Sequence, residues 1–294
     1  MSVVAFARDA RETIAEALRS LAGQEGIDRA EVIVADGSSD GTTAIVAGFP
    51  WVRHLRLPPG TMPALKGAAI REARGEIVAI LDPTDAAEAG WIRAIVAGLA
   101  DPSVTAVGGT VVLGGPRTGA NAAAYLFEYG AFNPPVAAGA TQGDLPGNNC
   151  AYRASALLDT CGDLLAGGFW KPFFHARIRE RGGQLHIHPA LQVQHLTRHR
   201  LLPFGRARFH YGRCFGAMRI ARARGPLRVL YVLAAPAVPA LLFLRHVARA
   251  LRHPGNRRLL PRALPALLAV CFFWGVGEML GTWLGPGRSC ARVY

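Results

Sequence analysis

Two apolar runs, each followed by an aspartate, constrain the fold of this chain more than any other feature. Residues 31–35 (EVIVA) precede Asp36, and residues 76–81 (EIVAIL) precede Asp82. Short continuous apolar runs, rich in β-branched residues and ended by turn residues, are typical of strands buried on both faces. Helical patterns separate the strand-like runs of the first hundred residues. We therefore predict an α/β domain with a mainly parallel sheet covered by helices on both faces.

The same patterns predict the other elements of this domain, which we expect to cover residues 1–200. Further strands are expected at residues 2–7, 52–57, 106–113, 184–187 and 192–194, and helices at residues 10–21, 61–73, 91–99, 119–131 and 173–181. Ligands of such sheets bind at the carboxyl ends of the strands. Asp36 and Asp82 both lie at such ends and are candidate ligand contacts.

The C-terminal third differs in charge and hydropathy. Residues 182–277 contain many arginines and no Asp or Glu, which suggests a region that faces phosphates, of lipids or of nucleic acid. Residues 201–226 mix arginine with aromatic and apolar side chains and predict a basic interfacial helix. Residues 227–294 then hold two hydrophobic helices, transmembrane or re-entrant, and a short tail.

The two apolar stretches leave their topology open. Residues 229–244 are short for a span, which needs roughly 20 residues. Residues 263–284 are long enough but contain Glu278, and an acid inside a bilayer is costly. The alternative, two core helices of a soluble domain, is disfavoured because no acids balance the flanking arginines. Nucleic-acid binding is disfavoured because the arginines flank apolar runs.

The five cysteines lie far apart, and none forms a CxxC pair. We therefore expect neither a zinc cage nor a disulfide framework, and a reducing compartment fits best. The first residues lack a basic region followed by a long apolar core, so no cleaved signal peptide is expected.

Residues 31–42 (EVIVADGSSDGT) resemble the first nucleotide-binding motif of the family 2, inverting, GT-A-type glycosyltransferases, which typically read EVIVVDDGSTDGT. Residues 3–14 are similar to the opening strand and helix of that family. Residues 63–76 (PALKGAAIREARGE) are similar to its helix ending in ARGE. The order and spacing of these motifs extend the resemblance over residues 2–195. It implies a Rossmann-like GT-A domain followed by a C-terminal helical membrane region.

The resemblance implies donor contacts at Ala7, Asp36, Lys66 and Asp82. In that arrangement the Asp36 carboxylate accepts an N–H of the nucleotide base and Ala7 lies against the base. The Lys66 ammonium offsets diphosphate charge. The ordinary alternatives are an Asx-type turn at Asp36 and a solvated helix residue at Lys66.

The DxD motif of the family falls at Asp82-Pro83-Thr84. A Mg²⁺ or Mn²⁺ ion at this place requires hard oxygen ligands. The resemblance implies a metal site at Asp82, Asp85 and His195. Because Thr84 replaces the second acid, either Asp85 takes that place or the affinity for metal is weak.

The catalytic base is the largest departure from the family. An acidic pair usually precedes the last helix of the domain, where this chain has Lys171-Pro172. Lysine is no base at neutral pH unless its pKa is strongly lowered. His175, about one helical turn later, and Asp144, ahead of the acceptor loop, are the substitutes that we predict.

The acceptor side is implied by residues 147–153, which resemble the GxNxAxRR segment of the family. Asn148 and Asn149 are the residues expected there. The chain has no QxxRW motif, which favours transfer of a single sugar.

The resemblance therefore implies a glycosyltransferase that moves a sugar, with inversion, from a UDP-sugar to a lipid-linked or saccharide acceptor. The expected process is cell-surface polysaccharide or glycolipid biosynthesis. The expected partners are donor, acceptor and membrane lipids, and not nucleic acid. The expected location is the inner membrane of the cell, with the catalytic domain in the cytoplasm. The alternative is a catalytically impaired member that serves as a binding or assembly subunit of a polysaccharide export system.

Overall fold

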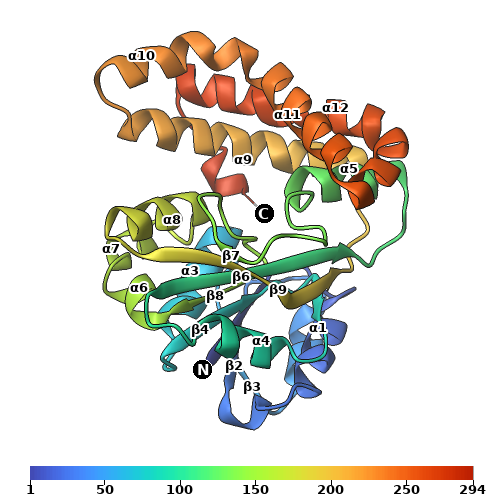
Figure 1. Ribbon diagram of the computed structural model, residues 1–294, viewed down its shortest axis with the longest axis vertical. Helices are drawn as coiled ribbons and strands as arrows, with labels where there is room; N and C mark the ends of the chain where they lie inside the picture. Colours follow the sequence, from blue (N-terminus) through green and yellow to red (C-terminus); the bar gives the residue numbers. More distant parts are fainter. Residues whose placement is uncertain (294) are drawn as a thin grey trace. The chain divides into compact units, whose positions relative to one another are not determined.

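The apolar runs of the N-terminal region form parallel strands of one sheet (Figure 1). The computed structural model describes residues 1–293. Four strands form the parallel part: β1 (Ser2–Ala7), β2 (Glu31–Asp36), β3 (Val52–Arg56) and β4 (Ile77–Leu81). Strand β1 lies between β2 and β4, and β3 pairs with β2. Asp36 and Asp82 therefore follow two strands that flank β1, at the same edge of the sheet.

The rest of the sheet is mixed. Its strands are β5 (Asp85–Ala87), β6 (Val104–Leu113), β7 (Gly139–Ala140), β8 (Asn149–Arg153) and β9 (Gln184–His195). The order is β3-β2-β1-β4-β8-β6-β9-β5, and β7 pairs with β9. Strand β8 runs antiparallel to both β4 and β6. The two strands predicted at residues 184–187 and 192–194 are one strand, because β9 stays paired with β6 across a register shift.

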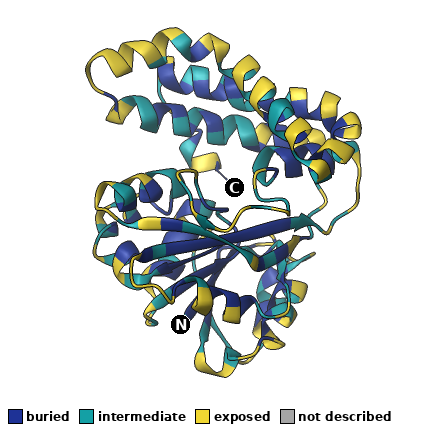
Figure 2. Cartoon of the chain, in the orientation of Figure 1, coloured by how far each residue is buried: buried dark blue, intermediate teal, exposed yellow. Residues whose placement is uncertain are grey.

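Helices cover this sheet and complete a first unit, residues 1–114 and 132–197. They are α1 (Ile14–Ala22), the 3-10 helix η1 (Ile27–Arg29), α2 (Thr42–Ala47), α3 (Met62–Arg71), α4 (Trp91–Gly98), α6 (Ala154–Leu158), α7 (Gly162–Leu165) and α8 (Lys171–Glu180). The periodic residues of α1, among them Ile14, Leu18 and Leu21, are buried, as the pattern predicts. Figure 2 shows the central strands as the buried core of this unit.

The second unit consists of helices from two parts of the chain, residues 115–131 and residues 198 onward. They are α5 (Gly119–Glu128), α9 (Leu201–Arg222), α10 (Gly225–Ala234), η2 (Ala235–Ala237), α11 (Val238–Arg252), α12 (Pro254–Leu284) and η3 (Cys290–Arg292). The helix expected at residues 119–131 thus packs with the C-terminal helices.

Helix α9, predicted as an interfacial helix, has one face buried against α12. A Cβ added to Gly212 would lie 2.3 Å from the Trp274 carbonyl oxygen, and one added to Gly281 would lie 2.0 Å from the Arg213 carbonyl oxygen. Only glycine allows two helix backbones to approach so closely. The glycines therefore fix the α9–α12 pair.

Glu278, expected as an isolated acid, has partners in α9 and α12. Its side chain is 6% exposed, and Oε1 lies 2.5 Å from Nη1 of Arg219 on α9. Oε2 accepts a hydrogen bond of 2.8 Å from Nε1 of Trp274. The buried carboxylate is therefore paired within the helical unit, which lowers its cost there.

Two helical stretches are long and apolar enough to cross a membrane, judged by length and composition. The first, Gly225–Arg252, joins α10, η2 and α11, and almost none of its most apolar part is buried. The second is α12, and a little under half of its most apolar part is buried. Figure 2 shows exposed residues along much of α10 and α11. Exposed apolar surface of this extent suits a lipid environment.

One cysteine pair differs from the expectation of reduced thiols. Cys214 on α9 and Cys290 in η3 form a disulfide across 76 residues of sequence. Their spacing carries no motif, and the packing of the tail against α9 brings them together. Cys150, Cys161 and Cys271 are free and buried, as expected.

Candidate active site

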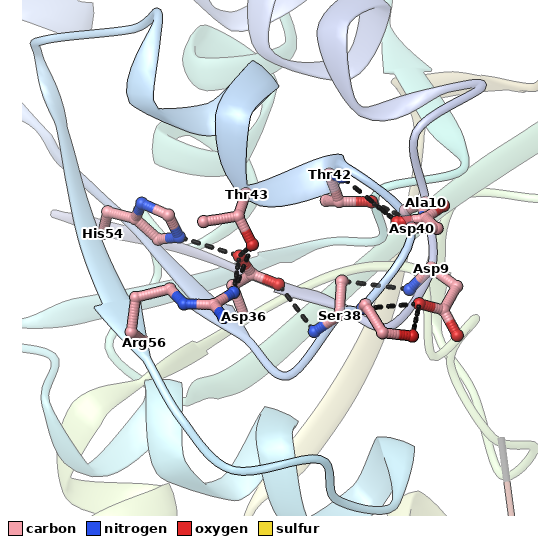
Figure 3. A network of polar contacts seen from close by, with 10 residues as sticks. Asp9, Ala10, Asp36, Ser38, Asp40, Thr42, Thr43, His54 and Arg56 are labelled. Atoms are coloured by element: carbon pink, nitrogen blue, oxygen red, sulfur yellow. Dashed lines mark hydrogen bonds and ion pairs between the residues drawn. The ribbon is translucent and has the colours of Figure 1, made fainter.

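The carboxylate of Asp36, at the end of β2, is enclosed by its own neighbours (Figure 3). Its side chain is fully buried, and Oδ1 accepts a 2.8 Å hydrogen bond from the backbone N–H of Ser38. Oδ2 accepts hydrogen bonds from Thr43 Oγ1 (2.8 Å), His54 Nε2 (2.9 Å) and Arg56 Nη1 (2.8 Å). Both oxygens of Asp36 are therefore already hydrogen-bonded inside the protein.

These contacts set the charge state of Asp36. Burial alone would raise its pKa, but the hydrogen bonds from Ser38, His54 and Thr43 outweigh that effect and lower the pKa to about 2. Ala7, the other residue expected at the base, is also fully buried and stands opposite Asp36 in the sheet register. Asp36 is thus ionised at neutral pH, and a nucleotide base would have to share an oxygen with these donors.

Strand β3 supplies two partners of Asp36 that the sequence analysis did not identify. His54 and Arg56 both lie on β3, and Arg56 stands opposite Asp36 in the β2–β3 register. The signal was present, because residues 52–57 were expected to form a strand next in sequence to β2. Pairing the two predicted strands would have placed Arg56 beside Asp36.

At the end of β4, Asp82 faces a lysine. Lys66 Nζ on α3 donates a 2.9 Å hydrogen bond to Asp82 Oδ1 and a 2.8 Å bond to the Gly147 carbonyl. The ammonium also lies 4.3 Å from the centre of the Phe6 ring, a cation–π distance. Lys66 is 8% exposed, so it is not the solvated helix residue of the ordinary alternative. The structure thus joins two of the four predicted donor contacts.

The charge state of Asp82 differs from that of Asp36. Burial raises the pKa of Asp82 to about 6, although the positive charge of Lys66 opposes the shift. The negative charge of Asp85 adds to the rise. At neutral pH the pair is therefore an ammonium beside a carboxylate that titrates close to physiological pH.

The three residues expected to bind metal do not form a metal site. Asp85 is fully buried, and its Oδ1 lies 2.9 Å from Nδ1 of His195, which stands opposite it in the β5–β9 register. Asp82 is paired with Lys66 instead. Within residues 1–293, no three His, Cys, Asp or Glu side chains are grouped closely enough to hold a metal ion. Among the described residues, Asp82, Asp85 and His195 therefore form no preformed three-ligand site, because Asp85 and His195 bind each other and Asp82 binds Lys66.

The two predicted substitutes for the catalytic base are in contact. His175 Nδ1 on α8 lies 2.9 Å from Asp144 Oδ1, and His175 Nε2 lies 2.7 Å from the Tyr152 hydroxyl. His175 is fully buried, whereas the Asp144 side chain is 37% exposed. Because both ring nitrogens have partners, only Asp144 of this pair presents a proton acceptor to a substrate.

The pKa shifts agree with that division. Burial lowers the pKa of His175, more than the hydrogen bond to Asp144 raises it, so the ring is neutral at pH 7. Burial alone would raise the pKa of Asp144, but the hydrogen bond from His175 and the positive charge of Lys171 lower it. Asp144 is therefore an ionised carboxylate, held in place by a neutral imidazole.

The chain has two lysines, and both bind the loop that follows Asp144. Lys171 Nζ, at the place of the usual acidic pair, donates a 2.9 Å hydrogen bond to the Leu145 carbonyl. Lys66 Nζ donates to the Gly147 carbonyl of the same loop. Lys171 thus fixes the loop between the predicted base and the predicted acceptor residues.

The two asparagines expected on the acceptor side have different surroundings. Asn149 is fully buried, and its amide binds the carbonyls of Thr110 (2.9 Å) and Leu191 (2.8 Å) and the indole N–H of Trp91 (2.8 Å). Asn148 is 1% exposed, and neither Oδ1 nor Nδ2 has a hydrogen-bond partner. A buried amide without partners is costly. The Asn148 amide therefore keeps unused hydrogen-bonding capacity in a buried position, whereas the Asn149 amide has none to spare.

Comparison with known proteins shows the family to which the chain belongs. The family model for glycosyl transferase family 2 matches residues 2–160. The succinoglycan biosynthesis protein ExoO of Rhizobium meliloti (strain 1021) is 33% identical over 99 residues, which are 33% of this chain and 28% of that protein. The matched segment thus spans less than a third of the ExoO chain.

Solved structures share the fold. The mannosyltransferase PcManGT from Pyrobaculum calidifontis, in complex with GDP-Man and Mn²⁺, superposes with a TM-score of 0.59 at 19% identity, over 95% of this chain and 86% of that chain. TarS 1-349 of S. aureus, in complex with UDP-GlcNAc, gives 0.51 at 15% identity, over 94% of this chain and 92% of that chain. The family model covers more than half of the sequence, so the chain belongs to glycosyl transferase family 2 and is a glycosyltransferase.

Proposed function

We propose that this glycosyltransferase moves a sugar, with inversion, from a nucleoside diphosphate donor to a lipid-linked or saccharide acceptor. The observation that carries the proposal is the Lys66–Asp82 pair at the end of β4, which places a cation beside a carboxylate at the ligand-binding edge of the sheet. Lys66 also binds the carbonyl of Gly147, next in sequence to Asn148. The backbone N–H of Asp82 donates a 3.2 Å hydrogen bond to the Asn148 carbonyl, so the donor end and the expected acceptor loop are joined.

The donor end of the site is formed by Lys66 and Asp82. The Lys66 ammonium is the fixed cation nearest Asp82, and it would stabilise the negative charge that develops on the leaving diphosphate. Ala7 and the turn after β2, which Asp36 holds through its internal hydrogen bonds, would position the nucleoside. PcManGT is solved with GDP-Man and TarS with UDP-GlcNAc. A UDP-sugar remains our prediction for this chain.

Asp144 is the proposed catalytic base. It would accept the proton of the acceptor hydroxyl as that oxygen attacks the anomeric carbon opposite the leaving diphosphate, which inverts the configuration. His175 is a positioning residue, because its ring is buried and holds Asp144 through Nδ1. Tyr152 fixes the other side of the ring. The alternative of an inactive binding subunit rested on the missing acidic pair, and an ionised carboxylate at Asp144 supports an active enzyme instead.

The biological setting is also proposed. Similarity to ExoO supports polysaccharide biosynthesis, and the two candidate spans support an association with the cell membrane. We propose the inner membrane, with the catalytic unit on the cytoplasmic side, where the Cys214–Cys290 pair would be held as thiols. Membrane lipids would be the partners of the apolar helices.

The test of function is a donor screen. The full chain in membranes is incubated with UDP- and GDP-sugars, with and without Mn²⁺, and nucleoside diphosphate release is measured. We expect release with one donor class and at least a 100-fold lower rate for Asp82→Ala. Binding of the donor without any release would contradict the proposal.

The base is tested separately. Asp144→Asn removes the proton acceptor while keeping the side-chain shape, and we expect a fall in kcat of roughly 10²–10⁴-fold with little change in the KM for the donor. Asp159→Asn is the matched control, because Asp159 is exposed and lies outside the site. Unchanged kcat in Asp144→Asn would remove Asp144 from the mechanism.

A further inference from the structure

A cavity in the helical unit is lined by arginines. It has a volume of about 430 Å³, within the range of roughly 300–1,000 Å³ typical of small-molecule sites. Its walls are formed by Gly130, Ala131, Arg245, Ala248, Arg249, Arg252 and His253. All of these residues belong to the second unit. The cavity is therefore separate from the site built on the sheet.

Three arginines of the cavity lie on one face of α11. Arg245, Arg249 and Arg252 are spaced four and three residues apart, which places their side chains on the same side of a helix. Like charges at this spacing destabilise a helix. None of the three has a hydrogen bond or ion pair from its side chain to any residue in 1–293. The cluster therefore carries positive charge that the described chain does not balance.

The acidic side chains of the described helical unit already form ion pairs with other arginines. Its acidic side chains are Glu128 and Glu278. Glu128 pairs with Arg208, and Glu278 pairs with Arg219. Both of these arginines lie on α9, so no acidic side chain of the described helical unit is left for the α11 cluster. An anion that does not belong to this unit would supply the counter-charge.

The other wall of the cavity is fixed and also suits an anion. Asn256 is fully buried, and its Nδ2 donates a 2.6 Å hydrogen bond to the Gly130 carbonyl, which holds the end of the α5 region in place. His253 accepts a 3.3 Å hydrogen bond from the Asn256 backbone N–H and caps the amino end of α12. The partial positive charge of that helix end adds to the arginines.

We propose that this cavity binds the phosphate of a lipid, as a phosphate or diphosphate headgroup. Guanidinium groups match phosphate oxygens in bidentate geometry, and three of them with a helix end suit one or two phosphates. The cavity also lies where the first candidate span ends and the second begins, which is where a lipid headgroup would lie. The site does not depend on the donor chemistry of the first unit.

The experiment titrates the detergent-solubilised full chain and measures affinity by microscale thermophoresis. The probes are farnesyl diphosphate, short-chain phosphatidylglycerol, short-chain phosphatidylcholine and inorganic pyrophosphate. We expect at least one of the two anionic lipids to bind more than tenfold tighter than phosphatidylcholine and pyrophosphate. The tighter of the two identifies the source as a polyprenyl diphosphate or a phospholipid. Equal binding of pyrophosphate would overturn the assignment to a lipid.

Matched variants separate a built site from general surface charge. The triple variant R245Q/R249Q/R252Q removes the cluster, and R257Q/R258Q/R262Q removes the same charge from exposed positions of α12. We expect the first to weaken anionic-lipid binding more than tenfold and the second less than threefold. Equal losses would overturn the proposal. The variant R245K/R249K/R252K keeps the charge but not the bidentate geometry, and its expected loss is intermediate.

Discussion

Asp36 and Asp82 hold similar places, at the ends of the two strands that flank β1, yet they differ in charge state. Asp36 has four hydrogen bonds to its own chain and a pKa of about 2, whereas Asp82 meets one lysine and has a pKa of about 6. Both carboxylates lie at the same edge of the sheet, so their position does not explain the difference. The number of hydrogen-bond donors within the protein decides whether such a carboxylate stabilises the fold or remains able to bind a ligand.

The largest expected effect is on activity, which should fall much more in an Asp82 variant than in an Asp36 variant. Asp82→Asn removes the charge that holds Lys66, and we expect kcat/KM to fall at least 100-fold, which corresponds to about 2.7 kcal/mol. Asp36→Asn should keep activity within tenfold. Both are measured by nucleoside diphosphate release. A 100-fold loss in a well-folded Asp36→Asn protein would break the comparison.

The next effect is on stability, where Asp36→Asn is expected to lose more than Asp82→Asn. The lowered pKa of Asp36 corresponds to about 2 kcal/mol of stability at pH 7, which Asp36→Asn should lose. Hydrogen exchange of the β2 and β3 amides, followed by mass spectrometry, measures it, with roughly 30-fold faster exchange expected where exchange requires unfolding. Asp82→Asn serves as the comparison, and equal acceleration in both variants would contradict the assignment.

The two carboxylates should also give opposite pH dependence. The pKa of folded Asp36, about 2, lies below its usual 3.8, so its contribution is complete above about pH 4 and is lost as the pH falls towards 2. The pKa of folded Asp82, about 6, lies above 3.8, so the folded chain holds a proton that the unfolded chain releases. Between about pH 4 and 6, Asp82 therefore lowers the free energy of unfolding as the pH rises.

Urea unfolding of wild type and of each Asn variant across pH 2–7 tests these signs. The difference between wild type and Asp36→Asn should shrink as the pH falls below about 4. Wild type should lose stability relative to Asp82→Asn as the pH rises from about 4 to 6. Slopes of the same sign for both variants would show that the two carboxylates do not differ as described.

The smallest effect concerns one donor to Asp36. His54→Phe keeps the ring but removes the 2.9 Å hydrogen bond from Nε2, and we expect a loss of about 1 kcal/mol and a higher pKa of Asp36. The loss is read from urea unfolding at pH 7. His186→Phe, at a partly exposed histidine of β9, should change stability by less than about 0.5 kcal/mol.

The sequence predicted the strands whose two faces are both covered. β1, β2 and β4 are continuous apolar runs because both of their faces pack against other side chains. β8 was not predicted, since its five residues (NCAYR) include Asn149 and Arg153, whose polar side chains bond to distant backbone carbonyls. β5 has only three residues, too few for a periodic pattern.

The sequence predicted which residues belong to the candidate site but not which of them are in contact. Motif positions named Lys66 and Asp82 as donor contacts, yet their hydrogen bond depends on the packing of α3 against the sheet. Asp85 and His195 were named as metal ligands, and only the β5–β9 pairing reveals that they bind each other. Register and packing join residues that are 16 to 110 positions apart, and short-range patterns do not encode those distances.

The bond between Cys214 and Cys290 limits how the chain crosses a bilayer. Both candidate spans of the described chain, Gly225–Arg252 and Pro254–Leu284, lie between these two cysteines. Two sulfurs joined covalently lie on one side of a membrane, so the intervening chain passes through it an even number of times. With two candidates, either both helices cross or neither does, and a single-pass anchor is excluded wherever this disulfide is formed.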